Sequence, residues 1–132
     1  MVSLIDTNII IRFLVGDHEE HLKIATEIFT KVENAEIEVE ILDSVVMEAL
    51  FILIKFYKLP KSEVIADLKR LIALRGVVGD KILLIETLNI VDDKNIDFVD
   101  ALICAKSRLQ GYGKLSFDTD VNKKYGHASQ IS

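Results

Sequence analysis

Apolar residues open the chain and stop at an acid. The run from Val2 to Ile5 ends in Asp6, which two small polar residues, Thr7 and Asn8, follow. A short apolar run bounded in this way is typical of a buried strand, here with a carboxylate at its carboxyl end. In open parallel sheets ligands bind beyond the carboxyl ends of the strands, and an acid there can hold a metal ion or act as a nucleophile.

Two helices are predicted next. Residues 8–15 predict a short helix with Asn8 or Thr7 as its N-cap and Gly16 at its end. Residues 18–33 predict an amphipathic helix, because apolar residues recur there at intervals of three and four. His18 and His21 lie three apart, a spacing compatible with metal binding, but their charged neighbours favour an exposed helix face.

A strand and a strongly apolar helix follow. Residues 37–42 alternate apolar and acidic side chains, the pattern of a strand with one solvent-exposed face. Asp43 and Ser44 offer an N-cap for a helix over residues 45–57, which carries Glu48 in its first turns. Burying an unpaired carboxylate is costly, so a buried Glu48 would be protonated or coordinated to a cation. The alternative is an exposed Glu48 near the positive end of its helix; we favour a role in a site.

The middle of the chain continues with helices. Residues 61–74 predict a helix that ends at Arg75 and Gly76, a residue tolerant of positive φ. Residues 77–80 are too few to assign to a strand or a loop. Residues 81–91 predict a further helix, and residues 92–95 predict a turn.

The last third carries three more acids of interest. Residues 96–105 predict the start of a buried helix with Asp97 as its natural N-cap. Asp100 then lies inside the apolar first turn, where capping does not explain it. Residues 114–117 predict a short strand that ends at Asp118. An acid again follows an apolar strand.

The order strand, helices, strand, helices, strand indicates an α/β fold of the three-layer α/β/α type, with a small, mostly parallel central sheet. With 132 residues, 50% of them hydrophobic, the chain fits one compact domain over residues 1–132, with a frayed tail at about 126–132. The single cysteine, Cys104, is expected in the core. We expect a cytoplasmic protein without a membrane span or signal peptide.

Taken alone, the net charge of −5 argues against a nucleic-acid partner. A cluster of carboxylates that binds divalent cations would invert the local potential, because the ions themselves could meet a phosphate. The charge therefore leaves the partner open.

Local structure explains four acids poorly: Asp6, Glu48, Asp100 and Asp118. Strand-end acids of a parallel sheet fall at one edge, and helix N-termini approach the same edge, so we expect the four to converge. Like charges brought together need a cation to neutralise them. Oxygen ligands without His or Cys indicate Mg²⁺ or Mn²⁺, which can polarise a phosphodiester and activate a water molecule.

These segments resemble the PIN domain, especially the VapC-type ribonuclease toxins of prokaryotic toxin–antitoxin pairs. Residues 4–8, Glu48, residues 97–103 and residues 115–118 match its motifs in order. The resemblance implies cleavage of single-stranded RNA, a homodimer and an antitoxin that blocks the site. It also implies a metal pocket of Asp6, Glu48, Asp100 and Asp118, oriented by the small polar residues Thr7, Asn8 and Ser116.

The chain departs from the commoner motif at Phe117, where a basic residue is usual. Candidate substitutes for contact with RNA are Arg12, Lys106, Lys123 and Lys124. Two acids are additional: Asp97 as a cap or accessory ligand, and Asp120 as a supporting or solvent-facing group.

Other families also place an acid after the first strand. A receiver domain needs paired acids and a strand-end lysine that are not clear here, and a haloacid-dehalogenase-type phosphatase needs Asp-x-Asp, where Asn8 stands instead. An RNA-processing PIN nuclease without an antitoxin, and a non-catalytic PIN-like module, are further alternatives. The sequence favours a metal-dependent endoribonuclease in which Asp6, Asp100 and Asp118 hold the ion or ions and Glu48 ligates or positions the attacking water.

Overall fold

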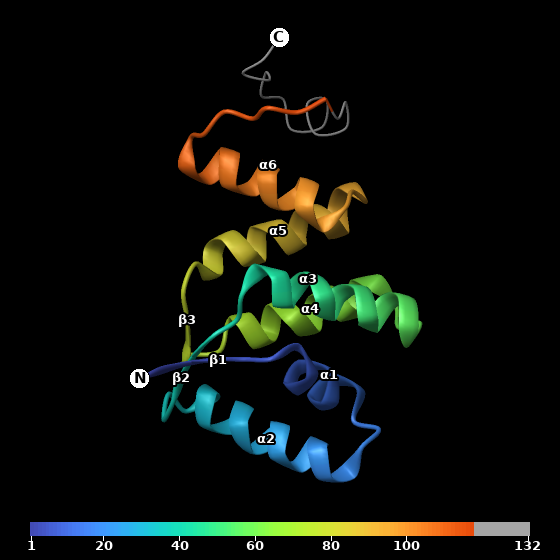
Figure 1. Ribbon diagram of the computed structural model, residues 1–132, viewed down its shortest axis with the longest axis vertical. Helices are drawn as coiled ribbons and strands as arrows, with labels where there is room; N and C mark the ends of the chain where they lie inside the picture. Colours follow the sequence, from blue (N-terminus) through green and yellow to red (C-terminus); the bar gives the residue numbers. More distant parts are fainter. Residues whose placement is uncertain (118–132) are drawn as a thin grey trace. The chain divides into compact units, whose positions relative to one another are not determined.

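The computed structural model describes residues 1–117 and divides the chain into two compact units, Met1–Lys81 and Ile82–Ser132 (Figure 1). Asp118, Asp120, Lys123, Lys124 and the tail at 126–132 lie outside the described residues.

A parallel sheet forms the first unit's centre. Its strands are β1 (Val2–Leu4), β2 (Glu38–Glu40) and β3 (Val77–Val78), in the order β1-β2-β3. Ser3 is in register with Val39, and Val39 with Val77. Helices connect the strands, as parallel pairing requires. The α/β class with a parallel sheet is confirmed, and the segment after residue 76 is a strand.

Strand β1 is more exposed than its apolar sequence predicts. Val2 is 46% exposed and Leu4 65%, and only the following residue, Ile5, is buried. The prediction of a buried first strand is therefore wrong for β1 itself. The strand lies at the edge of the described sheet, where neighbours cover less of each face, whereas Val39 on the central strand is 1% exposed.

Helices α1 (Thr7–Val15) and α2 (Glu19–Glu33) pack against each other on one side of β1 (Figure 1). The rings of Phe13 and Phe29 meet at 4.8 Å between centroids. Gly16 ends α1 in the left-handed region, at φ 69°, as predicted. The apolar stripe of α2 is confirmed, because Ala25, Phe29 and Val32 are buried.

The two histidines lie at the start of α2 and are exposed. Nδ1 of His18 accepts a hydrogen bond from the backbone N–H of His21 (3.2 Å), and their rings stack at 3.8 Å. The prediction of an exposed helix face is confirmed.

Helices α3 (Asp43–Phe51) and α4 (Lys61–Ile72) lie on the other side of β1 in Figure 1. Leu42, not Asp43 or Ser44, occupies the N-cap position of α3 and makes no side-chain cap, so the predicted cap is wrong. The α-helix gives way to a π-helical turn, η1 (Ile52–Phe56), in which the N–H of Tyr57 donates to the carbonyl of Ile52 (3.1 Å). The predicted single α-helix over 45–57 therefore has two parts.

Gly76 is needed for space and not for positive φ, which corrects the predicted role. A Cβ at this position would lie 2.6 Å from the carbonyl oxygen of Val32 and 2.4 Å from that of Ile37. The N–H of Gly76 donates to the carbonyl of Val32 (2.8 Å), and its carbonyl accepts from Val39 (2.9 Å). Backbone atoms of two other segments therefore lie so close to residue 76, just before β3, that they leave no room for a side chain.

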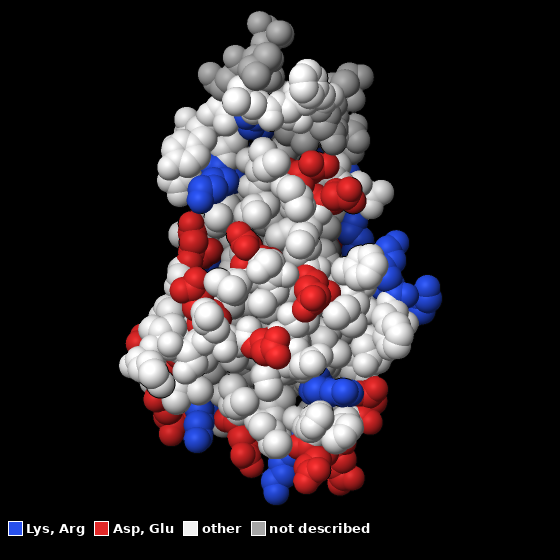
Figure 2. Space-filling model, viewed as in Figure 1, with Lys and Arg blue, Asp and Glu red and all other residues white. Residues whose placement is uncertain are grey.

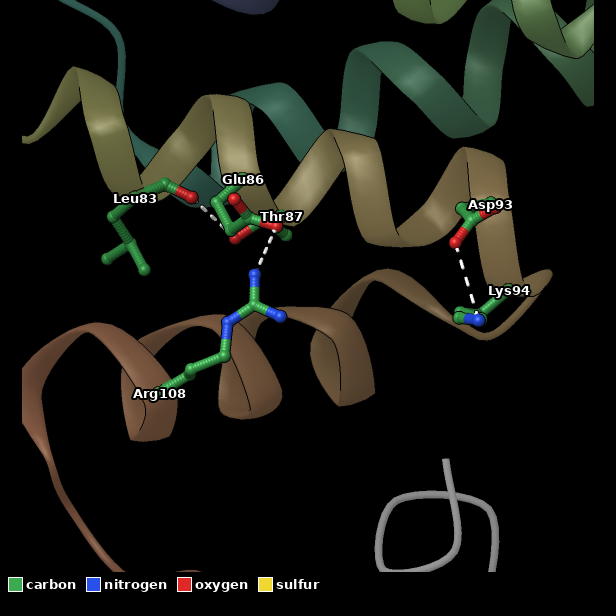
Figure 3. A network of polar contacts seen from close by, with 6 residues as sticks. All are labelled: Leu83, Glu86, Thr87, Asp93, Lys94 and Arg108. Atoms are coloured by element: carbon green, nitrogen blue, oxygen red, sulfur yellow. Dashed lines mark hydrogen bonds and ion pairs between the residues drawn. The ribbon is translucent and has the colours of Figure 1, made fainter. Parts of the chain in front are cut away.

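The second unit contains α6 (Phe98–Gln110) and all of α5 (Lys81–Lys94) except its first residue. Helix α5 runs on to Lys94, so the turn predicted at 92–95 is wrong except at Asn95, whose φ of 55° ends the helix. Arg108 of α6 donates to Oε1 of Glu86 on α5 at 2.6 Å (Figure 3). On the same helix Thr87, which is fully buried, donates to the carbonyl of Leu83 (2.7 Å).

Gly111 ends α6 at φ 70°. Cys104 is buried, as predicted. The strand predicted at 114–117 is reduced to a single β-bridge at Lys114, because pairing does not continue into the described residues that follow. No helix in residues 1–117 combines the length and apolar character that crossing a bilayer requires.

Candidate metal and catalytic site

Asp6 links the end of the first strand to the start of α1. It is itself the N-cap, with extended backbone (φ −80°, ψ 151°), and its Oδ1 accepts a hydrogen bond from the N–H of Thr7 at 2.8 Å. The predicted caps Asn8 and Thr7 are therefore wrong, because the acid occupies the position first. Asp6 is exposed, and its Oδ2 accepts no hydrogen bond from residues 1–117. The backbone thus orients this carboxylate while one oxygen faces solvent.

Glu48 lies in the second turn of α3 and is exposed, so the expectation of a buried Glu48 is wrong and the exposed alternative holds. The physical reason is that α3 buries one face only, through Val46, Ala49 and Leu50. Because nearly all residues around Glu48 are apolar, the sequence alone did not show which face of the helix is exposed. An exposed carboxylate can bind a cation without first losing its hydration to an apolar core.

Asp6 and Glu48 belong to neighbouring helices of the first unit. Helix α1 packs against α3, and each begins just beyond the carboxyl end of a parallel strand, α1 after β1 and α3 after β2. This is the edge at which sites form in parallel sheets. The two side chains are thus placed on the elements that the sequence predicted for them.

The second unit carries the next predicted acids. Asp97 occupies the N-cap position of α6, as predicted, but makes no side-chain cap. Asp100 is half-buried in the first turn of α6, where backbone N–H groups favour an anion. Ser116 is half-buried as well. Of the four predicted ligands, the structure places two in the first unit and Asp100 in the second, while Asp118 lies outside the described residues.

Two strand-end acids were not predicted as site residues. Asp43 is the first residue of α3, shortly after β2, and Asp80 follows β3 by two residues; both are exposed. The signal for Asp43 resembled that for Asp6, an acid just after a strand, whereas the strand before Asp80 has two residues, too few to produce a pattern. With Asp6 they make the carboxyl edge of the first unit acidic at all three strands.

The donor set suits a hard divalent cation. Every candidate is a carboxylate, the ligand type that Mg²⁺ and Mn²⁺ prefer, and Asp6 offers a fixed carboxylate with one oxygen that accepts no hydrogen bond from the described residues. Within residues 1–117 no three His, Cys, Asp or Glu side chains gather closely enough to hold a metal ion. The chemistry of the residues therefore fits such an ion, and the described part of the chain does not by itself assemble the ligand sphere.

A pocket of the first unit lies elsewhere. It has a volume of about 320 Å³ between α1, α2 and α4, and none of the candidate acids lines it. Its rim carries Thr26, Thr30 and Glu33 of α2 and the ion pair of Asp67 with Arg70 on α4. Its apolar lining is Phe13, Leu14, Phe29, Leu71 and Leu74. The mostly apolar lining suits an apolar side chain better than a phosphate.

The first unit thus has the architecture of an α/β protein that binds its ligand at the acidic carboxyl edge of a parallel sheet. The sequence profile described as PIN domain matches residues 3–126, and the chain belongs to this family of nucleases. No curated protein and no solved structure matches the chain significantly. Nucleases of the PIN family generally use divalent metal ions.

Proposed function

We propose that this protein is a metal-dependent endoribonuclease that hydrolyses phosphodiester bonds of single-stranded RNA in the cytoplasm. The observation that carries the proposal is Asp6, an exposed acid of a PIN-family chain that its own helix holds at the carboxyl edge of the sheet. All the candidate metal ligands are carboxylates, with no His or Cys among them. Metal-dependent hydrolysis of phosphodiesters is the activity that such a set of residues suits best.

In this proposal Asp6, Asp100 and Asp118 bind Mg²⁺ or Mn²⁺, and Glu48 ligates the ion or positions the attacking water. When bound, the ion would polarise the phosphodiester and lower the pKa of a water molecule. Thr7, Asn8 and Ser116 are assigned a positioning role. Thr7 supports this by donating its N–H to Asp6 and by being 4% exposed, so its backbone is held in place.

The test is cleavage of single-stranded RNA with Mn²⁺ or Mg²⁺ by the wild type and by Asp6→Asn. Asparagine caps a helix about as well as aspartate but is a much weaker metal ligand. We expect Asp6→Asn to unfold at the wild-type temperature and to lose at least about hundredfold in activity, since even the supporting partners of metal ligands contribute 10–100-fold. Equal activity in both proteins would end this assignment.

We further propose that the protein is the homodimeric toxin of a toxin–antitoxin pair. The pocket between α1, α2 and α4 supports an antitoxin partner, because its apolar lining and polar rim suit an inserted side chain of another protein. Leu71 is 6% exposed on its wall. If the antitoxin docks there, Leu14→Glu will abolish inhibition by the protein of a neighbouring reading frame while leaving RNA cleavage intact. Unchanged inhibition would favour an RNA-processing nuclease with another mode of control.

The other alternative is a non-catalytic PIN-like module that acts through protein contacts. The presence of all four motif acids, Asp6, Glu48, Asp100 and Asp118, counts against it. Metal-dependent cleavage that Asp6→Asn abolishes would exclude it.

A further inference from the structure

The α3–η1 run ends in a segment with an unusual combination of side chains. Residues 55–61 contain three lysines and two aromatic residues and no acid, in a chain whose net charge is −5. Within it we define the basic–aromatic patch as Lys55, Phe56, Tyr57 and Lys58. No role in the proposed cleavage has been assigned to these residues.

The patch faces solvent. Phe56 is 75% exposed, and Lys55 and Lys58 are exposed as well. Neither lysine forms an ion pair with a residue in the described part of the chain. Figure 2 shows basic side chains gathered at the right edge of the view, where Figure 1 places the end of this run.

The backbone fixes the aromatic pair. The wide turn of η1 closes at Tyr57, whose N–H donates to Ile52, and Lys58 then takes a φ of 58° before Pro60. The rings of Phe56 and Tyr57 meet edge to face, with centroids 5.1 Å apart and planes at 79°. Phe56 remains largely exposed in this pair.

We propose that the basic–aromatic patch binds single-stranded RNA, with Phe56 stacking on a base while Lys55 and Lys58 neutralise phosphates. Proteins that hold single strands combine cationic side chains with aromatic platforms in this way. The proposal rests on the proposed nuclease function, because it gives the substrate a second point of attachment outside the acidic edge.

The position on α3–η1 suits that role. Lys55 follows Glu48 by seven residues, which is about 10 Å along a helix axis. A stacked strand rises about 3.4 Å per nucleotide, so roughly three nucleotides would span the distance. The RNA strand would thus contact the lysines at one end of this distance. At the other end it would reach the acids, where the metal ion is expected to bind.

A second copy of the chain is the competing occupant of an exposed aromatic surface. An interface between identical patches would bring Lys55 and Lys58 of each copy together, and like charges at an interface are unfavourable. A polyanion neutralises the same charges. The charge on the patch therefore favours RNA.

The experiment measures binding in the Asp6→Asn background with a chelator present, so that RNA is not cut. The probe is a short, fluorescently labelled, unstructured RNA, titrated at several salt concentrations. Lys55→Gln/Lys58→Gln should weaken binding on the order of tenfold and reduce the slope of log K against log salt by about 1.4, or about 0.7 per lost phosphate contact. The matched control Lys23→Gln/Lys31→Gln removes two exposed lysines from α2 and should bind like the parent.

Substitutions of Phe56 distinguish stacking from apolar contact. Phe56→Tyr keeps an aromatic face and should bind like the parent, whereas Phe56→Leu keeps apolar bulk and should lose about fivefold or more. A duplex of the same sequence, whose bases are already stacked, should not respond to either substitution.

Equal affinity and salt slope for the two lysine double variants would overturn the proposal. So would unchanged RNA binding by Phe56→Leu accompanied by loss of self-association in sedimentation, which would make the patch a contact between copies. Wild-type protein that binds through the patch but cleaves no RNA with Mn²⁺ would leave this surface standing and refute the nuclease assignment. RNA cleavage by the wild type combined with equal binding by all variants would support the nuclease assignment and refute the patch.

Discussion

The two ends of the α3–η1 run carry opposite charge. The end at the carboxyl edge of the sheet has Asp43 and Glu48, with Asp6 at the N-cap of the adjoining helix α1, whereas the far end has Lys55 and Lys58. All five side chains are exposed. A single net charge for the chain conceals this division, because acids that suit a cation and lysines that suit a polyanion partly cancel in the sum. The lesson is that charge must be located on elements before it is used to exclude a partner.

The largest effect should come from the acidic end. We expect Glu48→Gln to lower kcat on the order of hundredfold and to leave KM nearly unchanged, because a group that positions the attacking water acts in the chemical step. Steady-state cleavage kinetics with Mn²⁺ measure both constants. Because Glu48 is exposed, the substitution should not destabilise the fold, and the variant should unfold at the same temperature as the wild type. A loss of activity then cannot be attributed to unfolding. A rise in KM at constant kcat would assign Glu48 to binding and remove the distinction between the ends.

The basic end should show the converse pattern, with a smaller effect. In the active protein, Lys55→Gln/Lys58→Gln should raise KM several-fold at low salt and leave kcat unchanged, because screened surface contacts contribute to association and not to bond cleavage. The difference from wild type should shrink as salt is added. A fall in kcat that persists at high salt would mean that these lysines act in catalysis.

The smallest expected effect is on stability, and it separates two roles of Asp6, its capping hydrogen bond and its negative charge. Asp6→Ala removes the cap of α1 and should lower the free energy of unfolding by about 1 kcal/mol, whereas Asp6→Asn should lower it by little. Chemical denaturation measures both. Similar losses of stability in the two variants would show that the negative charge of Asp6, and not its capping hydrogen bond, stabilises the fold.

Features set by local chemistry were predictable from the sequence. The strand–acid–helix junction at Asp6, the left-handed glycine at the end of α1 and the apolar stripe of α2 follow from patterns within a few residues. The parallel α/β class followed from the alternation of these elements.

Features set by packing between distant segments were not. Gly76 looked like a helix terminator, but its neighbours are the carbonyls of Val32 and Ile37, which only the fold brings to it. The exposure of β1 and Glu48 depends on which faces other elements cover, and an apolar sequence does not say which.

The candidate site was predicted in part. Asp6 and Glu48 stand on the expected elements, and Asp100 is in the expected turn of α6, while the approach of these acids to one another stays a prediction. Asp80 was missed because the strand before it has two residues, too few to produce a pattern.

The wide turn at Ile52–Phe56 sets the direction in which the side chains after it point. An α-helix advances by about 100° per residue, and a π-helical turn takes up about one extra residue. Lys58, which follows the turn, therefore points roughly 100° away from the direction that an uninterrupted α-helix of the same sequence would give it relative to Glu48. The extra residue thus decides which way the basic end of the run faces.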